Sequence, residues 1–334
     1  QVIIKTYVQM KTNNQKKILS ALLALTVLPF SSKAATIYST GNDTLNYCVN
    51  NTSSSYKTIA DNISIKTGDT VNVITSRYSE WTGKVTGKGT LNILSGGERT
   101  YIGTQKKKGS DYPDWTGHTG DVHIYPYKEV VSSCGFYGLV LHSGTFQPDN
   151  ISGSNYNKLF EKNRVVVHNG ATIAIESGTR GIRIGELETE TGSSLTGYYK
   201  KSSAISYYII GGKNSNAELA GKIYNSASGN KVGIIKEGTG TYVISGTNND
   251  INGGIRLTKG TLLIENDIEK TKAENGSGAT GKYGSVIVYE DAILGGNGSI
   301  ASATEVYGSI KPANNSLGTL YFTDFQSDPS QVNV

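Results

Sequence analysis

The densest group of side chains that could do chemistry lies in WTGHTGDVHIYPY, residues 115–127. Alternate residues of a strand share one face, so His123, Tyr125 and Tyr127 would lie side by side, next to a loop that carries His118. These types suit a solvated sheet face, a glycan-binding surface on which rings stack against sugars, or an acid–base site. The candidate ligand-binding residues are Trp115, His118, His123, Tyr125 and Tyr127.

A row of carboxylates lies in GELETETG, residues 185–192. Glu186, Glu188 and Glu190 would share one face of a strand, where like charges repel unless a cation lies between them. The row is therefore an exposed edge or a weak Ca²⁺ site, since Ca²⁺ prefers carboxylate oxygens. No cofactor and no other metal site is expected, because the four histidines show no HExxH motif or other zinc-ligand spacing.

The glycines of GTGT, residues 238–241, could suggest a phosphate-binding loop. Such loops lead into a helix N-terminus, and a Walker loop continues with Lys-Ser or Lys-Thr. The residues that follow here are YVIS, which favour a strand, so the sequence argues against nucleotide binding. The chain also shows no base beside paired carboxylates of the kind that a polysaccharide lyase or hydrolase needs, which argues against an enzyme.

The elements that must position these groups are short strands. The 334 residues include 41 glycines and 21 tyrosines; glycine opposes helix interiors, and tyrosine and β-branched residues favour pleated surfaces. At least a dozen β-like runs follow residue 37, and none has a helical pattern. They include NISIK, TVNVI, GTLNILS, DVHIYPY, RVVVHNG, ATIAIES, GTYVISG, GTLLIEN and SVIVYED. The predicted fold class is all-β.

One short phrase recurs along the chain: GTLNI from Gly89, GTYVI from Gly240, GTLLI from Gly260 and GTLYF from Gly318. The step from residue 240 to residue 260 is 20 residues, about one turn of a parallel β-solenoid. Glycine would take each corner, and alternating apolar residues such as Tyr242 and Ile244 would point into a narrow core.

The first 34 residues have the pattern of a secretory leader. After Met10 come KTNNQKK, the 13-residue apolar run ILSALLALTVLPF and then SSKA. This order predicts a signal peptide cleaved after Ala34, with residues 1–9 as translated upstream sequence; a buried segment of the fold is the alternative. The run is too short to span a bilayer, so we expect a secreted or surface-attached chain without a transmembrane segment.

The positive charge of the chain belongs to this leader. The leader holds five lysines and no acid, so its removal leaves 32 − 5 = 27 basic residues against 27 acidic ones. The formal charge of +5 therefore gives no argument for a nucleic-acid partner.

The two cysteines, Cys48 and Cys134, could form one disulfide after export. Buried free thiols are the alternative, because the sequence does not show whether the two residues lie within bonding distance.

Two stretches resemble a known family. KEGTGTYVISGTNNDINGGIRLTKGTLLIEN, residues 236–266, resembles the autotransporter-associated β-strand repeat, with its GxGTL strand, SGxN, GG corner and second GTL. YEDAILGGNGSIASATEVYGSIKPANNSLGTLYF, residues 289–322, resembles the region that commonly follows, and together they span about a quarter of the chain. The resemblance implies a right-handed parallel β-helix in an exported bacterial surface protein, and it implies no reaction.

The expected organisation is a leader over residues 1–34, an irregular β region or cap of the solenoid over 35–165, and a parallel β-helix over 166–334. An outer-membrane anchor or sorting domain is expected beyond residue 334. The expected function is that of a structural or adhesive segment of the cell surface, whose loops bind an extracellular glycan or a host-surface protein. The alternatives are a polysaccharide lyase or glycoside hydrolase on the same fold, and a stalk that binds nothing.

Export can be tested by expressing the chain in a bacterium with two membranes and sequencing the N-terminus of the exported product. We expect a mature chain that begins at Ala35, because small residues precede the cleavage site. An intact leader on a protein retained in the cytoplasm would contradict this expectation.

Overall fold

A computed structural model describes residues 35–47, 57–75, 79–96, 100–102, 113–127, 138–141, 144–145, 157–176, 180–198, 205–225, 231–268, 284–300, 302–312 and 318–322. Contacts divide the chain into residues 1–35 and residues 36–334, and every described strand belongs to the second unit. The described residues form thirty β-strands and no helix, which confirms the predicted all-β class. The predicted leader lies outside the described residues.

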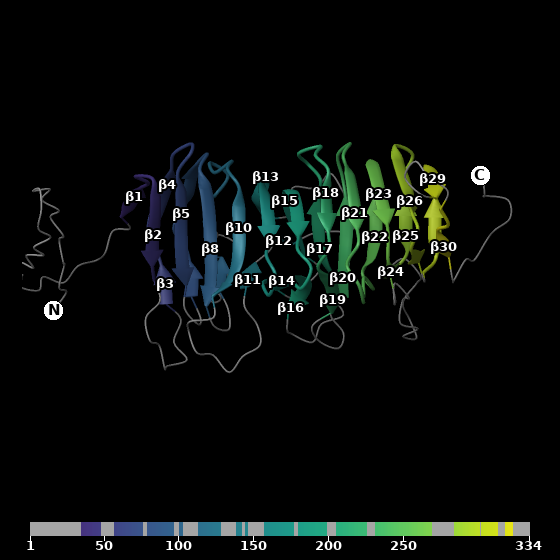
Figure 1. The fold of residues 1–334 in the computed structure, drawn as a ribbon, viewed down its shortest axis with the longest axis horizontal. Coiled ribbons are helices and arrows are strands. Elements are labelled where there is room, and N and C mark those ends of the chain that lie inside the picture. Colours follow the sequence, from purple (N-terminus) through teal and green to yellow (C-terminus); the bar gives the residue numbers. More distant parts are fainter. Residues whose placement is uncertain are drawn as a thin grey trace, which may run out of the picture. The chain divides into compact units, whose positions relative to one another are not determined.

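The strands are short and gather into four sheets (Figure 1). The largest sheet contains β2 (Asn42–Asn46), β5 (Thr70–Thr75), β8 (Thr90–Gly96), β10 (Val122–Tyr127), β12 (Gly144–Thr145), β13 (Asn157–Val167), β15 (Arg180–Thr189), β17 (Ile205–Ile210), β18 (Ala217–Leu219), β20 (Lys231–Lys236), β21 (Thr241–Ile244), β22 (Gly254–Leu257), β23 (Gly260–Ile264), β25 (Val286–Val288), β26 (Ala292–Gly296), β28 (Thr304–Val306) and β29 (Ser309–Pro312).

The second sheet contains β3 (Lys57–Ile59), β6 (Ser79–Trp81), β9 (Thr100–Ile102), β11 (Gly138–Leu141), β14 (Thr172–Glu176), β16 (Ser194–Tyr198) and β19 (Lys222–Asn225). The two smaller sheets contain β1 (Thr36–Tyr38), β4 (Asn62–Ile65) and β7 (Val85–Gly87), and β24 (Asp267–Ile268), β27 (Ser299–Ile300) and β30 (Tyr321–Phe322). Among the pairings of described strands, only that of β12 with β15 is antiparallel.

The two GT phrases that begin at Gly240 and Gly260 lie on neighbouring parallel strands. Thr241 of β21 pairs with Thr261 of β23, so the 20-residue step seen in the sequence is one step between adjacent strands. Thr70 of β5 and Thr90 of β8 are paired in the same way. The largest sheet also continues across residues 165 and 166, because β13 pairs with β10 and with β15.

The predicted corner residues meet two different backbone demands. Gly260 has a φ of +72°, a left-handed conformation that glycine adopts without steric cost. A Cβ atom at Gly240 would lie 1.9 Å from the backbone oxygen of Ser215, so the close approach of two segments requires glycine there. Asn248, with a φ of 56°, fits the tolerance of asparagine for the left-handed region.

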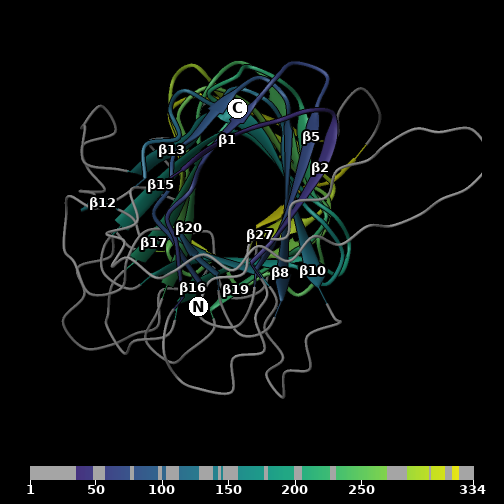
Figure 2. The ribbon, with the colours of Figure 1, turned by 90° about the vertical axis from the view of Figure 1, so that its left-hand side faces the viewer.

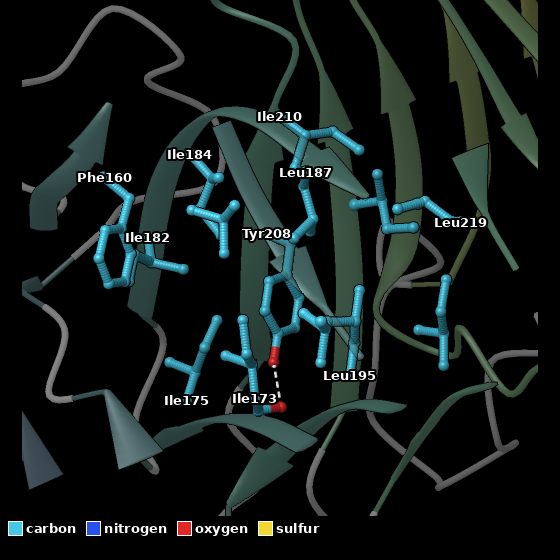
Figure 3. Packing of buried hydrophobic residues seen from close by; sticks show 14 of the residues in the cluster. Phe160, Ile173, Ile175, Ile182, Ile184, Leu187, Leu195, Tyr208, Ile210 and Leu219 are labelled. Atoms are coloured by element: carbon cyan, nitrogen blue, oxygen red, sulfur yellow. Dashed lines mark hydrogen bonds between the residues drawn. The ribbon is translucent and has the colours of Figure 1, made fainter. Parts of the chain in front are cut away.

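Figure 2 shows that the strands surround an interior. Apolar side chains fill this interior. Tyr242 and Ile244 are fully buried, as the alternation predicts, while Val243 between them is only partly buried. Figure 3 shows this packing around Tyr208, whose hydroxyl donates to the carbonyl of Ile173 at 2.8 Å. The apolar interior gains stability from the removal of this surface from water.

A lysine is buried at one corner. The side chain of Lys236 is fully buried, and its Nζ donates to the carbonyls of Glu237 and Gly238 at 2.8 Å and of Lys259 at 3.1 Å. Burial lowers the pKa of this ammonium group to about 8. The three bonds satisfy carbonyls at a corner and link it to the start of the next GT phrase.

Removal of the Tyr208 hydroxyl tests how much the buried hydrogen bonds of this interior contribute to stability. This hydroxyl accepts the N–H of Thr196 and lies 2.8 Å from the Thr196 carbonyl, so Tyr208→Phe leaves buried polar groups without their partner. We expect the free energy of unfolding to fall by about 1–3 kcal/mol. Urea denaturation measures the change; Tyr38→Phe is the control, because Tyr38 is 66% exposed. Equal denaturation midpoints for Tyr208→Phe and the native chain would contradict this role.

Candidate functional site

The outward face of β10, β13 and β15 carries most of the polar side chains that the sequence singles out. Val122 and Ile124 of β10 are fully buried, so the residues between and beyond them, His123 and Tyr125, face outward. His123 lies opposite Val166 of β13 in parallel register. Neighbouring strands therefore place outward side chains from distant parts of the chain in one row.

Arg164 of β13 holds a group of carboxylates together. Its guanidinium contacts Asp121 at 3.3 Å, Glu186 at 3.1 Å and Glu188 at 2.6 Å. Glu186 and Glu188 thus share a face of β15, as the sequence predicts, but their neighbour of opposite charge is Arg164. The hydrogen bond to Glu188 raises the pKa of Arg164, so the group is cationic at any physiological pH.

Two histidines and a glutamate form a hydrogen-bonded chain. His168 Nδ1 lies 2.7 Å from a carboxylate oxygen of Glu190, and His168 Nε2 lies 2.9 Å from His123 Nδ1. Because the carboxylate accepts, His168 donates from Nδ1 and accepts the Nδ1 proton of His123 at its Nε2, an assignment made from the network. Burial, and then the neighbouring His168, lower the pKa of His123. In this hydrogen-bonded network the Nε2 lone pair of His123 therefore stays available as an acceptor.

The rings on this face stack on one another. The rings of Tyr125 and His168 are almost parallel and lie face to face, with centroids 3.9 Å apart and an interplanar angle of 4°. His123 lies beside both, at 6.1 Å from Tyr125 and 5.2 Å from His168. Stacking covers one face of the Tyr125 ring, so a ligand meets the edges of this cluster more than its faces.

Two of the predicted ligand-binding residues lie in the interior. Trp115 is 1% exposed and packs edge-on against Trp81 at 4.9 Å, and its indole N–H donates to the Gly83 carbonyl. His118 is also 1% exposed. The prediction of surface stacking for these two residues is therefore wrong, because buried and exposed residues alternate over 113–120 and Trp115 and His118 take buried positions.

Three predicted residues cannot be placed in the site. Tyr127 ends β10, but its side chain lies outside the described part of the structure. Cys48 and Cys134 lie outside the described residues, so their disulfide stays a prediction.

A shallow groove of about 770 Å³ runs along this outward face. It crosses six neighbouring strands, β10, β13, β15, β18, β21 and β23. Its aliphatic floor is formed by Val166, Ala217, Val243 and Leu263, and its polar rim includes His123, Arg164, His168, Glu188, Glu190, Asn216, Glu218 and Thr241. An apolar floor with a polar rim is the general form of a ligand-binding site.

Arg164, His168 and the groove floor are the residues of this candidate site that sequence reasoning missed. Aligning DVHIY (121–125) with RVVVH (164–168) would have found the first two, because that register places Asp121 opposite Arg164 and Tyr125 opposite His168. No sequence signal marks the floor. Val243 and Leu263 lie within the GT phrases, between residues that belong to the core, and nothing in the sequence distinguishes them as groove residues.

No group of three or more His, Cys, Asp or Glu side chains within the described ranges is arranged to hold a metal ion. In the same part of the chain, no helix has the length and apolar character needed to cross a membrane. No protein-family model matches the chain, and no curated protein matches it. The resemblance to the autotransporter repeat stays a prediction that rests on the quoted motifs.

The buried His118 predicts a pH dependence of stability. Its Nε2 donates to the Gly89 carbonyl at 2.9 Å and its Nδ1 accepts from Asn163, so the neutral ring is already satisfied. Burial lowers the pKa of His118 below its ordinary value of 6.5. Below pH 6.5 the unfolded chain therefore binds an additional proton, and stability is lost as pH falls through the folded pKa.

The measurement is the thermal midpoint between pH 7 and pH 5. We expect the thermal midpoint of His118→Gln to fall less steeply with pH than that of the native chain. Part of the fall should remain in this variant, because the pKa of His123 is also lowered. Trp115→Phe is the control, because it weakens the same interior without removing a titrating group. An unchanged slope in His118→Gln would overturn the assignment.

Proposed function

We propose that this chain is a segment of an exported cell-surface protein, folded as a right-handed parallel β-helix, that binds an extracellular glycan or a host-surface protein along its outer face. The in-register parallel strands, the 20-residue step between GT phrases and the predicted secretory leader support this proposal. The observation that carries it is the groove across six strands, since this groove places an apolar floor and polar groups on a surface that repeats along the chain.

The dimensions of the groove favour a linear polymer. Five steps between neighbouring strands, at about 4.8 Å each, give a length of about 24 Å. The strands beneath the groove already have a partner on each side, so an extended peptide cannot add to a free sheet edge there. A sugar chain can instead place its apolar ring faces on the floor and its hydroxyl groups at the rim.

A polysaccharide lyase or hydrolase is the second candidate. The observation that favours it is the hydrogen-bonded chain from Glu190 through His168 to His123, because such a chain orients an imidazole that takes up a proton. A passive stalk is the third candidate, and the repetition of strands supports it equally.

One pair of assays separates the three candidates. The mature chain, residues 35–334, is screened on a glycan array and incubated with the polysaccharides of the same panel. We expect retention of a glycan without release of shortened products. Product release would favour the enzyme, and no effect in either assay would favour the stalk.

The groove itself can be tested by filling it. Ala220→Tyr adds bulk without charge at the lining of the groove, and we expect it to weaken binding of the retained glycan by about tenfold or more. Ser309→Tyr places the same side chain at an exposed position of β29, outside the groove, and should leave affinity unchanged. Equal affinities in both variants would place the binding surface elsewhere.

A further inference from the structure

We propose that the groove takes a linear oligosaccharide that carries free amino groups, that is, a cationic amino-sugar chain. This inference rests on the proposed glycan-binding function and specifies the class of glycan.

The first argument is the charge of the groove. Three carboxylates line it, those of Glu188, Glu190 and Glu218, against the single guanidinium of Arg164, and within the described residues no lysine lines it. The guanidinium also contacts Asp121 and Glu186, which lie beside the groove and do not line it. Glu190 and Glu218 have no contact with this guanidinium, so the groove keeps an excess of negative charge and a uronate or another acidic sugar would meet like charge.

The second argument is that two of these carboxylates are held in place at the surface. Glu190, with its side chain 49% exposed, accepts the backbone N–H of Asn169 at 2.9 Å and a proton of His168. These bonds, led by that of Asn169, lower the pKa of Glu190, so the group is anionic at neutral pH. Glu218 accepts the hydroxyl of Ser245. A fixed carboxylate loses less conformational freedom when a cation binds.

The third argument is that His123 adds no opposing charge at neutral pH. His123 faces Asp121, Arg164, Glu188 and His168, and burial still dominates in lowering its pKa. The neutral ring presents Nε2 as an acceptor, as derived above. Ammonium and hydroxyl groups are donors, so the acceptors at this rim are complementary to an amino sugar.

The fourth argument is the floor. Val243 and Leu263 are register partners on β21 and β23 and form a short aliphatic strip beside Glu218, while Val166 lies on the far side of Glu188. The apolar C–H face of a pyranose ring can cover such a strip, while its amino groups reach Glu190 and Glu218. A lysine peptide would carry similar charge on long flexible side chains, at a greater entropic cost.

The test measures binding of the mature chain to a β-linked glucosamine hexamer, its fully N-acetylated counterpart, a uronic-acid hexamer and a lysine hexamer, by calorimetry at low and high salt. We expect the glucosamine hexamer to bind at least about tenfold more tightly than the other three, with affinity that falls as salt rises. Glu190→Gln and Glu218→Gln should each weaken this binding about fivefold. Glu290→Gln, which removes an exposed charge outside the groove, should not change it.

The outcomes distinguish this inference from the function on which it rests. Binding of the N-acetylated or uronic-acid hexamer with equal or greater affinity would overturn the cationic ligand and leave a glycan-binding function. Equal binding of the lysine hexamer would reduce the groove to a general cation surface and overturn the glycan. No binding of any sugar, here or on the glycan array, would overturn both proposals. Circular dichroism of each variant verifies that it folds, and the salt dependence of the native chain tests the charge argument without any variant.

Discussion

Parallel pairing in register is the constraint on which the rest of this structure depends. It places each residue about 4.8 Å from its counterpart on the next strand, with the side chains on the same face. Inward positions are therefore apolar in most strands, as Ile244 and Ile264 are. An outward position that carries charge needs an opposite charge in the neighbouring strand, and Arg164 between Asp121 and Glu186 meets that need.

The same constraint explains the polar groups of the interior and the corners. Segments that stack so closely leave room only for glycine at Gly240, and they bring carbonyls together where the chain turns. Lys236 bonds three of these carbonyls, and Tyr208 bonds others deeper in the core. Buried donors and acceptors are thereby satisfied without a compact globular core.

Stacking also shapes the candidate site. Because rings on adjacent strands lie one above the other, Tyr125 and His168 cover one another, and the surface that remains consists of ring edges, carboxylates and a short aliphatic strip. A groove formed in this way extends across the strands and so lengthens with each one. This geometry suits a long, thin ligand better than a compact one, and the excess of carboxylates at the rim adds a preference in charge.

The sequence by itself determined the all-β class, the alternation of buried and outward residues, the 20-residue step between GT phrases and the shared face of Glu186 and Glu188, because these depend on local period and neighbouring residues. Only the tertiary structure decided that Trp115 and His118 are buried, and that Arg164 and His168 complete the site. Val122 and Val165 are register partners although 43 residues separate them. The residues between these two strands show no repeating pattern that would predict the pairing. Which strands become neighbours is decided by the packing of the whole sheet.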